Sequence, residues 1–190
     1  MQEISQKINA FWFEKCPDMD KWFMKSTEYD EYIKEQFADN LKDAENGKYF
    51  NWLLTKDSYI AHIILMDQFS RQIYRGTGDA FKNDNSILMF TLLGIDVYYP
   101  LCTKYEKMFI LLPFMHSENK QYQTQGLQRV QQELENNPND PFWENVHSHT
   151  FGHFKVIARF GRFPKRNAVL NRTSTPEELK YIEEHADRPY

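Results

Sequence analysis

The stretch SYIAHIILMDQFSRQIYR, residues 58–75, decides the fold class and contains the first candidate functional residues. Its apolar residues recur every three or four positions, which is the spacing of one face of an α-helix. At about 100° per residue, Asp67, Arg71 and Arg75 fall within the same arc, of about 120°, as the isoleucines. An amphipathic helix normally directs its charges away from the core. The pattern therefore predicts a helix whose three charged side chains point inward or line a cleft.

The rest of the chain is also helical in its pattern. The expected helices cover about residues 3–13, 27–47, 57–75, 84–98, 102–112, 117–135, 140–159 and 176–185. The apolar face of the 84–98 helix is expected to consist of Ile87, Leu88, Thr91, Leu92 and Ile95. A chain of 190 residues is most economically one domain. We therefore predict an all-α single domain, residues 1–190, of about seven to eight antiparallel helices.

Particular residues are expected to set the helix ends. The predicted N-caps are Asp84, Ser117, Asp140 and Thr175, the last in a capping box with Glu178. Gly47 should end the second helix, because glycine adopts the left-handed conformation that follows many helices. Pro113 should end or kink the fifth, because proline lacks the amide donor. The first helix should end before Cys16 and Pro17.

Composition narrows the classes of function. Hydrophobic residues make up 41% of the chain and charged residues 26%, which is typical of a globular protein. The net charge of −4 disfavours generic binding to nucleic acid or to an anionic membrane, since both need a broad basic surface. Apolar stretches are too short to span a bilayer, and the N-terminus does not resemble a signal peptide. A cytoplasmic protein with reduced, buried Cys16 and Cys102 is the expectation.

Arginine is unevenly distributed along the chain. Six of the eight arginines lie in two short segments, Arg71 and Arg75 in the first and Arg159, Arg162, Arg166 and Arg172 in the second, whereas the lysines are scattered. A guanidinium presents a planar fork of donors that matches carboxylate or phosphate. The distribution therefore predicts one arginine-rich polar cluster, in which Arg71, His116 and Arg162 converge.

Histidines near these segments add candidate chemistry. His116, Ser117 and Glu118 stand where a helix should begin, and a histidine beside a glutamate is a possible general base with its orienting partner. His153 is expected among apolar neighbours. His149 and His153 at i, i+4 supply only half of a zinc site, so no metal is expected. Glycine motifs that bind phosphates or dinucleotides do not occur, so no cofactor is expected.

Several ordered motifs resemble one known family. They are FWF (11–13), DQFSRQIYRGTGDAF (67–81), PFMHSE (113–118), FGRFPKRNAVLNR (160–172) and TPEE (175–178). This set is similar to the family catalogued as domain of unknown function 924, whose members look like tetratricopeptide-type helical proteins. The resemblance picks out Asp67, Gln68, Arg71, Arg75, His116, Ser117, Glu118, His153, Gly161, Arg162, Pro164, Arg166, Asn167 and Arg172. The chain departs from the family at Lys165, where histidine is common, and at Asn171, where glycine is usual.

Three functional hypotheses follow. The favoured one is a cleft that binds a small phosphate or carboxylate ligand, or an acidic peptide end. Its ligand-binding residues would be Asp67, Arg71, Arg75, His116, Glu118, His153, Arg162, Arg166 and Arg172. Five arginines against Asp67 and Glu118 would leave a surplus of about three positive charges, which favours a ligand over a balanced internal network. The alternatives are a protein-interaction scaffold whose charged cluster is structural, and a hydrolase-like enzyme using His116 and Glu118, with His153 as a further catalytic candidate.

Overall fold

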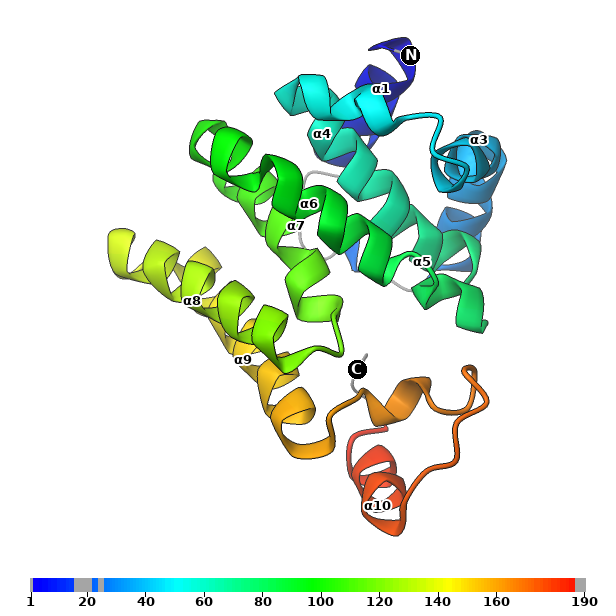
Figure 1. Ribbon diagram of the computed structural model, residues 1–190, viewed down its shortest axis with the longest axis vertical. Coiled ribbons are helices and arrows are strands. Elements are labelled where there is room, and N and C mark those ends of the chain that lie inside the picture. Colours follow the sequence, from blue (N-terminus) through cyan, green and yellow to red (C-terminus); the bar gives the residue numbers. More distant parts are fainter. Residues whose placement is uncertain (1, 16–21, 24–25, 187–190) are drawn as a thin grey trace. The chain divides into compact units, whose positions relative to one another are not determined.

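The computed structural model describes residues 2–15, 22–23 and 26–186, and all regular structure in these ranges is helical (Figure 1). The prediction of an all-α protein is thereby confirmed. Contacts divide the chain into two compact units, Met1–Pro113 and Phe114–Tyr190, and each is described by itself. The single domain, the antiparallel order and the tetratricopeptide-like arrangement stay predictions.

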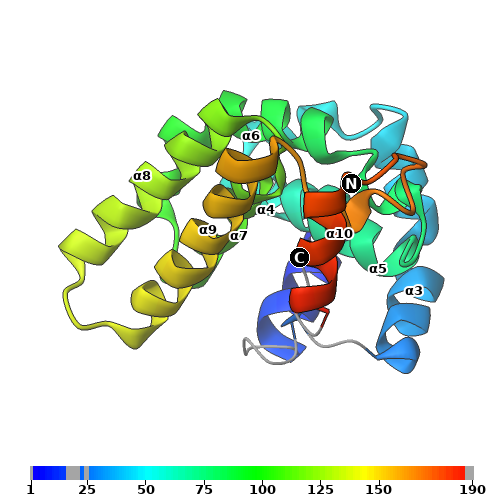
Figure 2. The same ribbon diagram turned by 90° about the horizontal axis from the view of Figure 1, so that it is seen from below.

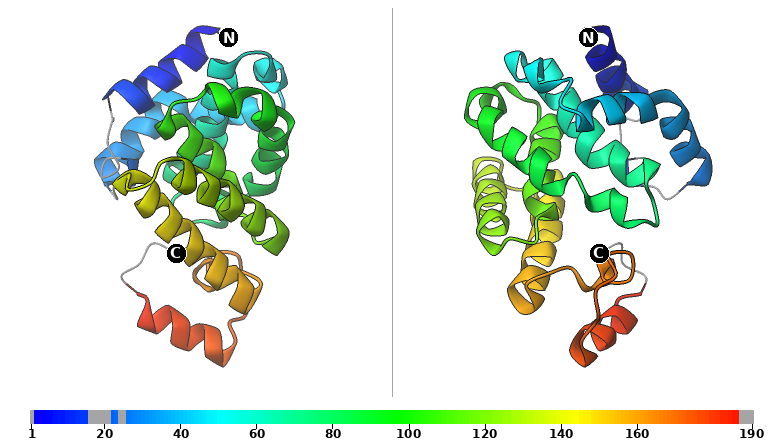
Figure 3. Two further views of the ribbon diagram at one scale, coloured as in Figure 1. Left: turned by 90° about the vertical axis from the view of Figure 1, so that its left-hand side faces the viewer. Right: turned by 45° about the vertical axis from the view of Figure 1, so that its right-hand side comes forward.

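The first unit contains most of the helices. Its elements are α1 (Gln2–Asn9), η1 (Ala10–Lys15), α3 (Thr27–Glu45), η2 (Phe50–Leu54), α4 (Lys56–Ile63), η3 (Ile64–Phe69), α5 (Ser70–Ile73), η4 (Gly78–Phe81), α6 (Asp84–Tyr98), η5 (Tyr99–Leu101) and most of α7 (Lys104–His116). The long helix α3 lies beside η3 and α5 (Figure 3). This arrangement sets the candidate residues of the 58–75 stretch against α3 on one side.

The second unit is smaller. It contains the end of α7, then α8 (Lys120–Asn136), α9 (Pro141–Phe160), η6 (Pro164–Arg166) and α10 (Pro176–Glu184). Helices α8 and α9 pack side by side along their length (Figure 2). The arginine-rich segment that follows α9 forms a loop broken only by η6, as the proline in it suggested.

Aromatic side chains form the core of the first unit. The Phe37 and Phe69 ring centroids are 4.7 Å apart. Trp12 meets Phe69 at 5.4 Å and Phe109 at 5.5 Å, both edge to face. Such aromatic pairs add about 0.5–1.5 kcal/mol each beyond the burial of their area. The core thus ties η1, α3, η3 and α7 together although they are distant in sequence.

The stretch 57–75 is not one regular α-helix, which corrects the prediction. Between α4 and α5 the backbone forms a π-helix, η3, with a wider turn. Side chains supplement the carbonyls of this turn: the Ser70 hydroxyl donates to Met66 O at 2.7 Å and Arg71 Nη1 donates to Asp67 O at 3.1 Å. Wide turns of this kind often occur at functional sites. Periodicity at 3.6 residues per turn could not reveal the change of register.

One of the two outcomes expected at Pro113 and one predicted cap are wrong. Helix α7 does not end at Pro113 but continues to His116, because residues 108–115 are buried and their packing offsets the lost hydrogen bond; a kink at Pro113 stays a prediction. Ser117 does not cap the next helix. Asn119 does, accepting from the Gln121 amide at 2.8 Å, while the Ser117 hydroxyl accepts from the Asn119 amide at 3.1 Å.

A second predicted cap is also wrong, and three helix ends are confirmed. Asn83 occupies the N-cap of α6, and the predicted cap Asp84 bonds to Arg71 instead. Asp140 caps α9, Thr175 and Glu178 form the capping box, and Gly47 has φ 79° just after α3.

The two cysteine predictions have different outcomes. Cys16, together with the expected helix end before Cys16 and Pro17, lies outside the described residues. Cys102 is a free thiol as expected, but it is only partly buried, and its Sγ donates to Tyr98 O at 3.2 Å. Burial, with a smaller contribution from the charge of Glu106, raises the pKa of the Cys102 thiol to about 12. A thiol with so high a pKa is a poor nucleophile at neutral pH.

Candidate functional site

Arg71 joins three elements of the first unit. Its Nη2 donates to Asp84 Oδ1 at 2.9 Å, and its Nη1 donates to Ala80 O at 3.3 Å and lies 3.7 Å from Asp67 Oδ1. The Asp67 side chain is fully buried and the Arg71 side chain largely so. Burial lowers the pKa of Arg71, but the charges of Asp84 and Asp67 outweigh it, so that the pKa is raised. The guanidinium therefore stays charged and links α5, η4 and α6.

Arg75 is also paired, nearer to solvent. Its Nη2 donates to Asp30 Oδ1 at 2.8 Å and its Nε donates to Asp30 Oδ2, which makes a two-pronged contact with α3. The Arg75 side chain is 40% exposed. An exposed ion pair of this kind contributes little to stability, so Arg75 mainly orients the end of α5.

Glu118 and Arg172 form the centre of the cluster in the second unit. Arg172 Nη1 and Nη2 donate to the two carboxylate oxygens of Glu118 at 2.6 and 3.0 Å, and the Phe163 amide donates to Glu118 Oε1 at 2.8 Å. Burial raises the pKa of Glu118, but these hydrogen bonds outweigh it and lower the pKa. A carboxylate held in this way is a weak base at neutral pH.

Glu178 organises the arginine loop. It accepts from Arg162 Nε and Nη2 at 2.6 and 2.8 Å, and from the Thr175 amide at 2.8 Å. Asn167, which is buried, donates to the same carboxylate at 3.3 Å and accepts from Arg172 Nε at 2.9 Å. The Arg162 hydrogen bonds, opposed by burial, lower the pKa of Glu178 to about 2. The buried Glu178 carboxylate of α10 thus holds both ends of the loop, at Arg162 and at Thr175.

The structure shows the surroundings of the two residues at which the chain departs from the family pattern, Lys165 and Asn171. Asn171 has φ 52°, in the left-handed region that favours glycine and that asparagine tolerates better than other residues. This explains why asparagine is acceptable there. Lys165 Nζ donates to the carbonyl of His185 at the end of α10.

His116, His153 and Arg166 lie together beside the loop. The His116 and His153 rings are 6.3 Å apart, and His153 meets Phe163 edge to face at 5.7 Å. Arg166 stacks over Phe163 at 4.3 Å and donates to His116 O at 3.1 Å. His153 is buried with its Nδ1 2.9 Å from His149 O, and burial, opposed by that hydrogen bond, lowers its pKa to about 3. His153 is therefore neutral at physiological pH.

The nine predicted ligand-binding residues fall into two groups. Asp67, Arg71 and Arg75 are in the first unit, while His116, Glu118, His153, Arg162, Arg166 and Arg172 gather in the second. The predicted convergence of Arg71 with His116 and Arg162 joins the two units and stays a prediction. The surplus of positive charge expected from the sequence is offset, because Asp30, Asp84 and Glu178 also form ion pairs with these arginines. Asp84 and Glu178 had been interpreted only as helix caps.

In the described ranges, no group of three or more His, Cys, Asp and Glu side chains is arranged to hold a metal ion. None of the helices described is long and apolar enough to cross a membrane.

Replacing Glu178 by glutamine is expected to lower the free energy of unfolding by about 1.5–3 kcal/mol, because hydrogen bonds to a charged group are lost. The folded pKa of Glu178 lies below the unfolded value of 4.5. Its contribution should therefore be present above about pH 4.5 and be lost as the pH falls towards about 2. Denaturant titration at pH 7 and pH 3 checks both. Glu177→Gln is the control, since its pair with Arg159 is exposed; equal losses in the two variants would contradict the role of Glu178.

Comparison with known proteins gives a family and a structural relative. A family model described as "Bacterial protein of unknown function (DUF924)" matches residues 8–186. The chain is similar to the solved structure of a protein of unknown function, ATU0120, from Agrobacterium tumefaciens, with a TM-score of 0.86 and 30% identity over 96% of this chain and 98% of that one. A search of curated proteins gave no match.

Proposed function

This chain belongs to the DUF924 family of bacterial proteins of unknown function, and we propose that it is a protein-interaction module whose charged clusters are structural. One observation carries the proposal: six large apolar side chains are exposed on three neighbouring elements of the first unit. These residues, called the apolar surface below, are Phe50 and Leu54 of η2, Met89, Leu93 and Val97 of α6, and Leu101 of η5. Large apolar side chains exposed together on elements that contact one another, as η2 and η5 both contact α6, mark an interaction site.

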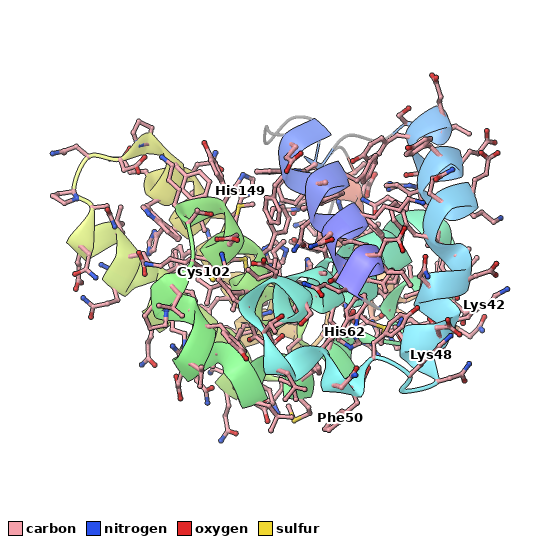
Figure 4. All side chains as sticks on the ribbon, turned by 90° about the horizontal axis from the view of Figure 1, so that it is seen from above. Lys42, Lys48, Phe50, His62, Cys102 and His149 are labelled. Carbon is pink, nitrogen blue, oxygen red and sulfur yellow. The ribbon has the colours of Figure 1, made fainter. Side chains whose placement is uncertain are left out.

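The apolar surface stands on a rigid base. Element η2 is anchored by Tyr49 and Trp52, which are buried and stack at 4.3 Å, and it meets α6 through a 2.6 Å hydrogen bond from the Tyr98 hydroxyl to Leu53 O. Phe50 projects away from the ribbon (Figure 4). A surface whose backbone is already fixed loses little conformational entropy when it binds.

Helix α6 differs from helix α8 in the composition of its exposed residues. The exposed residues of α6 are Asn85, Ser86, Met89, Leu93, Asp96 and Val97. Those of α8 are all polar: Lys120, Gln121, Gln125, Gln128, Gln132, Glu135 and Asn136. Half of the exposed residues of α6 are therefore apolar, whereas the solvent-facing side of a surface helix normally carries polar residues. The exposed face of α8, which is entirely polar, shows this normal pattern.

The charged clusters are better explained as braces than as a ligand site. Arg71, Arg75, Arg162 and Arg172 each bond to carboxylates of this chain. Such bonds occupy the guanidinium forks that an anion would use. The hydrolase hypothesis is weakened by Glu118, whose carboxylate oxygens accept from Arg172 and from a backbone amide. Anion binding and hydrolysis remain predictions with less support than the interaction module.

Site-specific photo-crosslinking tests the proposal. A benzophenone amino acid placed at Leu93 should form a covalent adduct with a partner protein in the cells that naturally make this protein. The same amino acid at Leu179, an exposed leucine of α10 outside the apolar surface, should form none. Mass spectrometry of the adduct identifies the partner. Equal labelling at the two positions, or no adduct at Leu93, would contradict an interaction through the apolar surface.

A further inference from the structure

We infer that the occupant of the apolar surface is a second copy of this chain, so that the protein is a two-fold symmetric dimer; this inference rests on the proposed function. Its first support is the amount of apolar area. The six side chains are between 43% and 77% exposed. With about 150 Å² for each of the six when fully exposed, the low end of the aromatic range because five of them are aliphatic, the apolar surface amounts to roughly 600 Å².

That area fits a complete partner better than a single short peptide segment. A standard protein interface buries about 800 Å² on each partner, of which rather more than half is apolar. The area of the apolar surface is large enough to form the whole apolar part of such an interface. The largest apolar patch on a typical monomer is about 300–600 Å² and is often functional, so the apolar surface lies at the upper end of that range. Polar residues at its margin, such as Asn85 and Ser86 of α6, would complete the rim.

The geometry of α6 favours an identical partner. Met89, Leu93 and Val97 are spaced four residues apart and form one ridge, which Leu101 continues into η5. Ridges of this spacing on two helices interdigitate at about −50°, the commonest helix packing in globular proteins. A two-fold axis places the same ridge on both sides of the contact, so one sequence supplies both halves. Phe50 and Leu54 of η2 would then extend the contact beyond the crossing helices.

Sedimentation velocity and light scattering of the full chain provide the test. At concentrations on the order of 10–100 μM, wild type should have twice the 22.9 kDa mass of one chain, because association follows mass action. Leu93→Glu should reduce that mass twofold, since it places a charge at the centre of the ridge. Leu54→Glu is the second variant, on a different element, and should do the same. Circular dichroism establishes that each variant is folded.

The control is Leu179→Glu, which introduces the same charge at an exposed leucine of α10 and should remain dimeric. A wild type that stays monomeric at all these concentrations overturns the inference, as does a dimer that survives both Leu93→Glu and Leu54→Glu. Failure of the dimer is distinguishable from failure of the interaction module. A monomeric wild type whose Leu93 position crosslinks to a different protein would end the dimer inference and leave the proposed function standing.

Discussion

Arg71→Ala is expected to lower the free energy of unfolding by about 3–5 kcal/mol, the largest single effect we anticipate. The substitution removes the guanidinium from the buried carboxylate of Asp67 and from Asp84. It also removes the donor to the Ala80 carbonyl, which fixes η4 against α5. Breaking a buried pair by removing one partner is costly because the other charge stays in a poorly solvated place. Denaturant titration of the purified variant measures the loss.

Arg75→Ala is the matched control for this experiment. It removes an arginine four residues away whose pair with Asp30 is more exposed, so the loss should be at most about 1 kcal/mol. If Arg71→Ala were as stable as Arg75→Ala, Arg71 would not brace the fold. The cluster in the first unit would then return to consideration as a ligand site.

His62→Phe is expected to make the protein more resistant to acid, with the second-largest effect. His62 is buried, its ring lies 4.1 Å from that of Phe90, and its Nδ1 has no hydrogen-bond partner in the part of the chain that the structure describes. Burial lowers the pKa of His62 from 6.5 to about 4. As the pH falls, the unfolded chain therefore binds this proton before the folded chain does. Stability is lost between about pH 6.5 and pH 4, by about 3 kcal/mol in total.

The phenylalanine variant cannot take up that proton, so its advantage over wild type should grow across this interval. Near pH 7.5 the two should differ by about 1 kcal/mol or less, because the rings are similar in shape and the unbonded nitrogen is removed. Unfolding titrations at several pH values measure the difference. His149→Phe, which removes an exposed histidine, should keep the steep acid loss of wild type. A constant difference between His62→Phe and wild type at all pH values would contradict the assignment to His62.

The sequence predicted local structure correctly where it depends on contacts between residues only a few positions apart. Thr175 and Glu178 form the predicted capping box, and Asp140 caps α9, because these contacts span only a few residues. Pro113 shows the limit of such rules: its local effect is outweighed by the buried packing of α7, which a linear pattern does not contain. The π-helix η3 is a different limit, because a pattern with 3.6 residues per turn does not reveal a local change to a wider turn.

The sequence singled out the candidate arginines together with Asp67 and Glu118, but not Asp30, Asp84 and Glu178 as further partners of these arginines. Arg162 and Arg172 stand out by their clustering, whereas Glu178 looks like an ordinary helix-starting acid in the sequence. Pairing over 16 and 54 residues is a property of the folded chain. The apolar surface had a signal that was available: Met89, Leu93 and Val97 repeat every four residues, opposite the core face of Ile87, Leu88 and Ile95. A helix apolar on both faces should be examined for a second partner.

The composition of the apolar surface also determines how association would respond to cold. All six of its residues are uncharged and apolar, so their removal from water is driven by entropy near room temperature and carries a negative change in heat capacity. Such a contact weakens on cooling. Two chains joined in this way would separate in the cold and rejoin on warming.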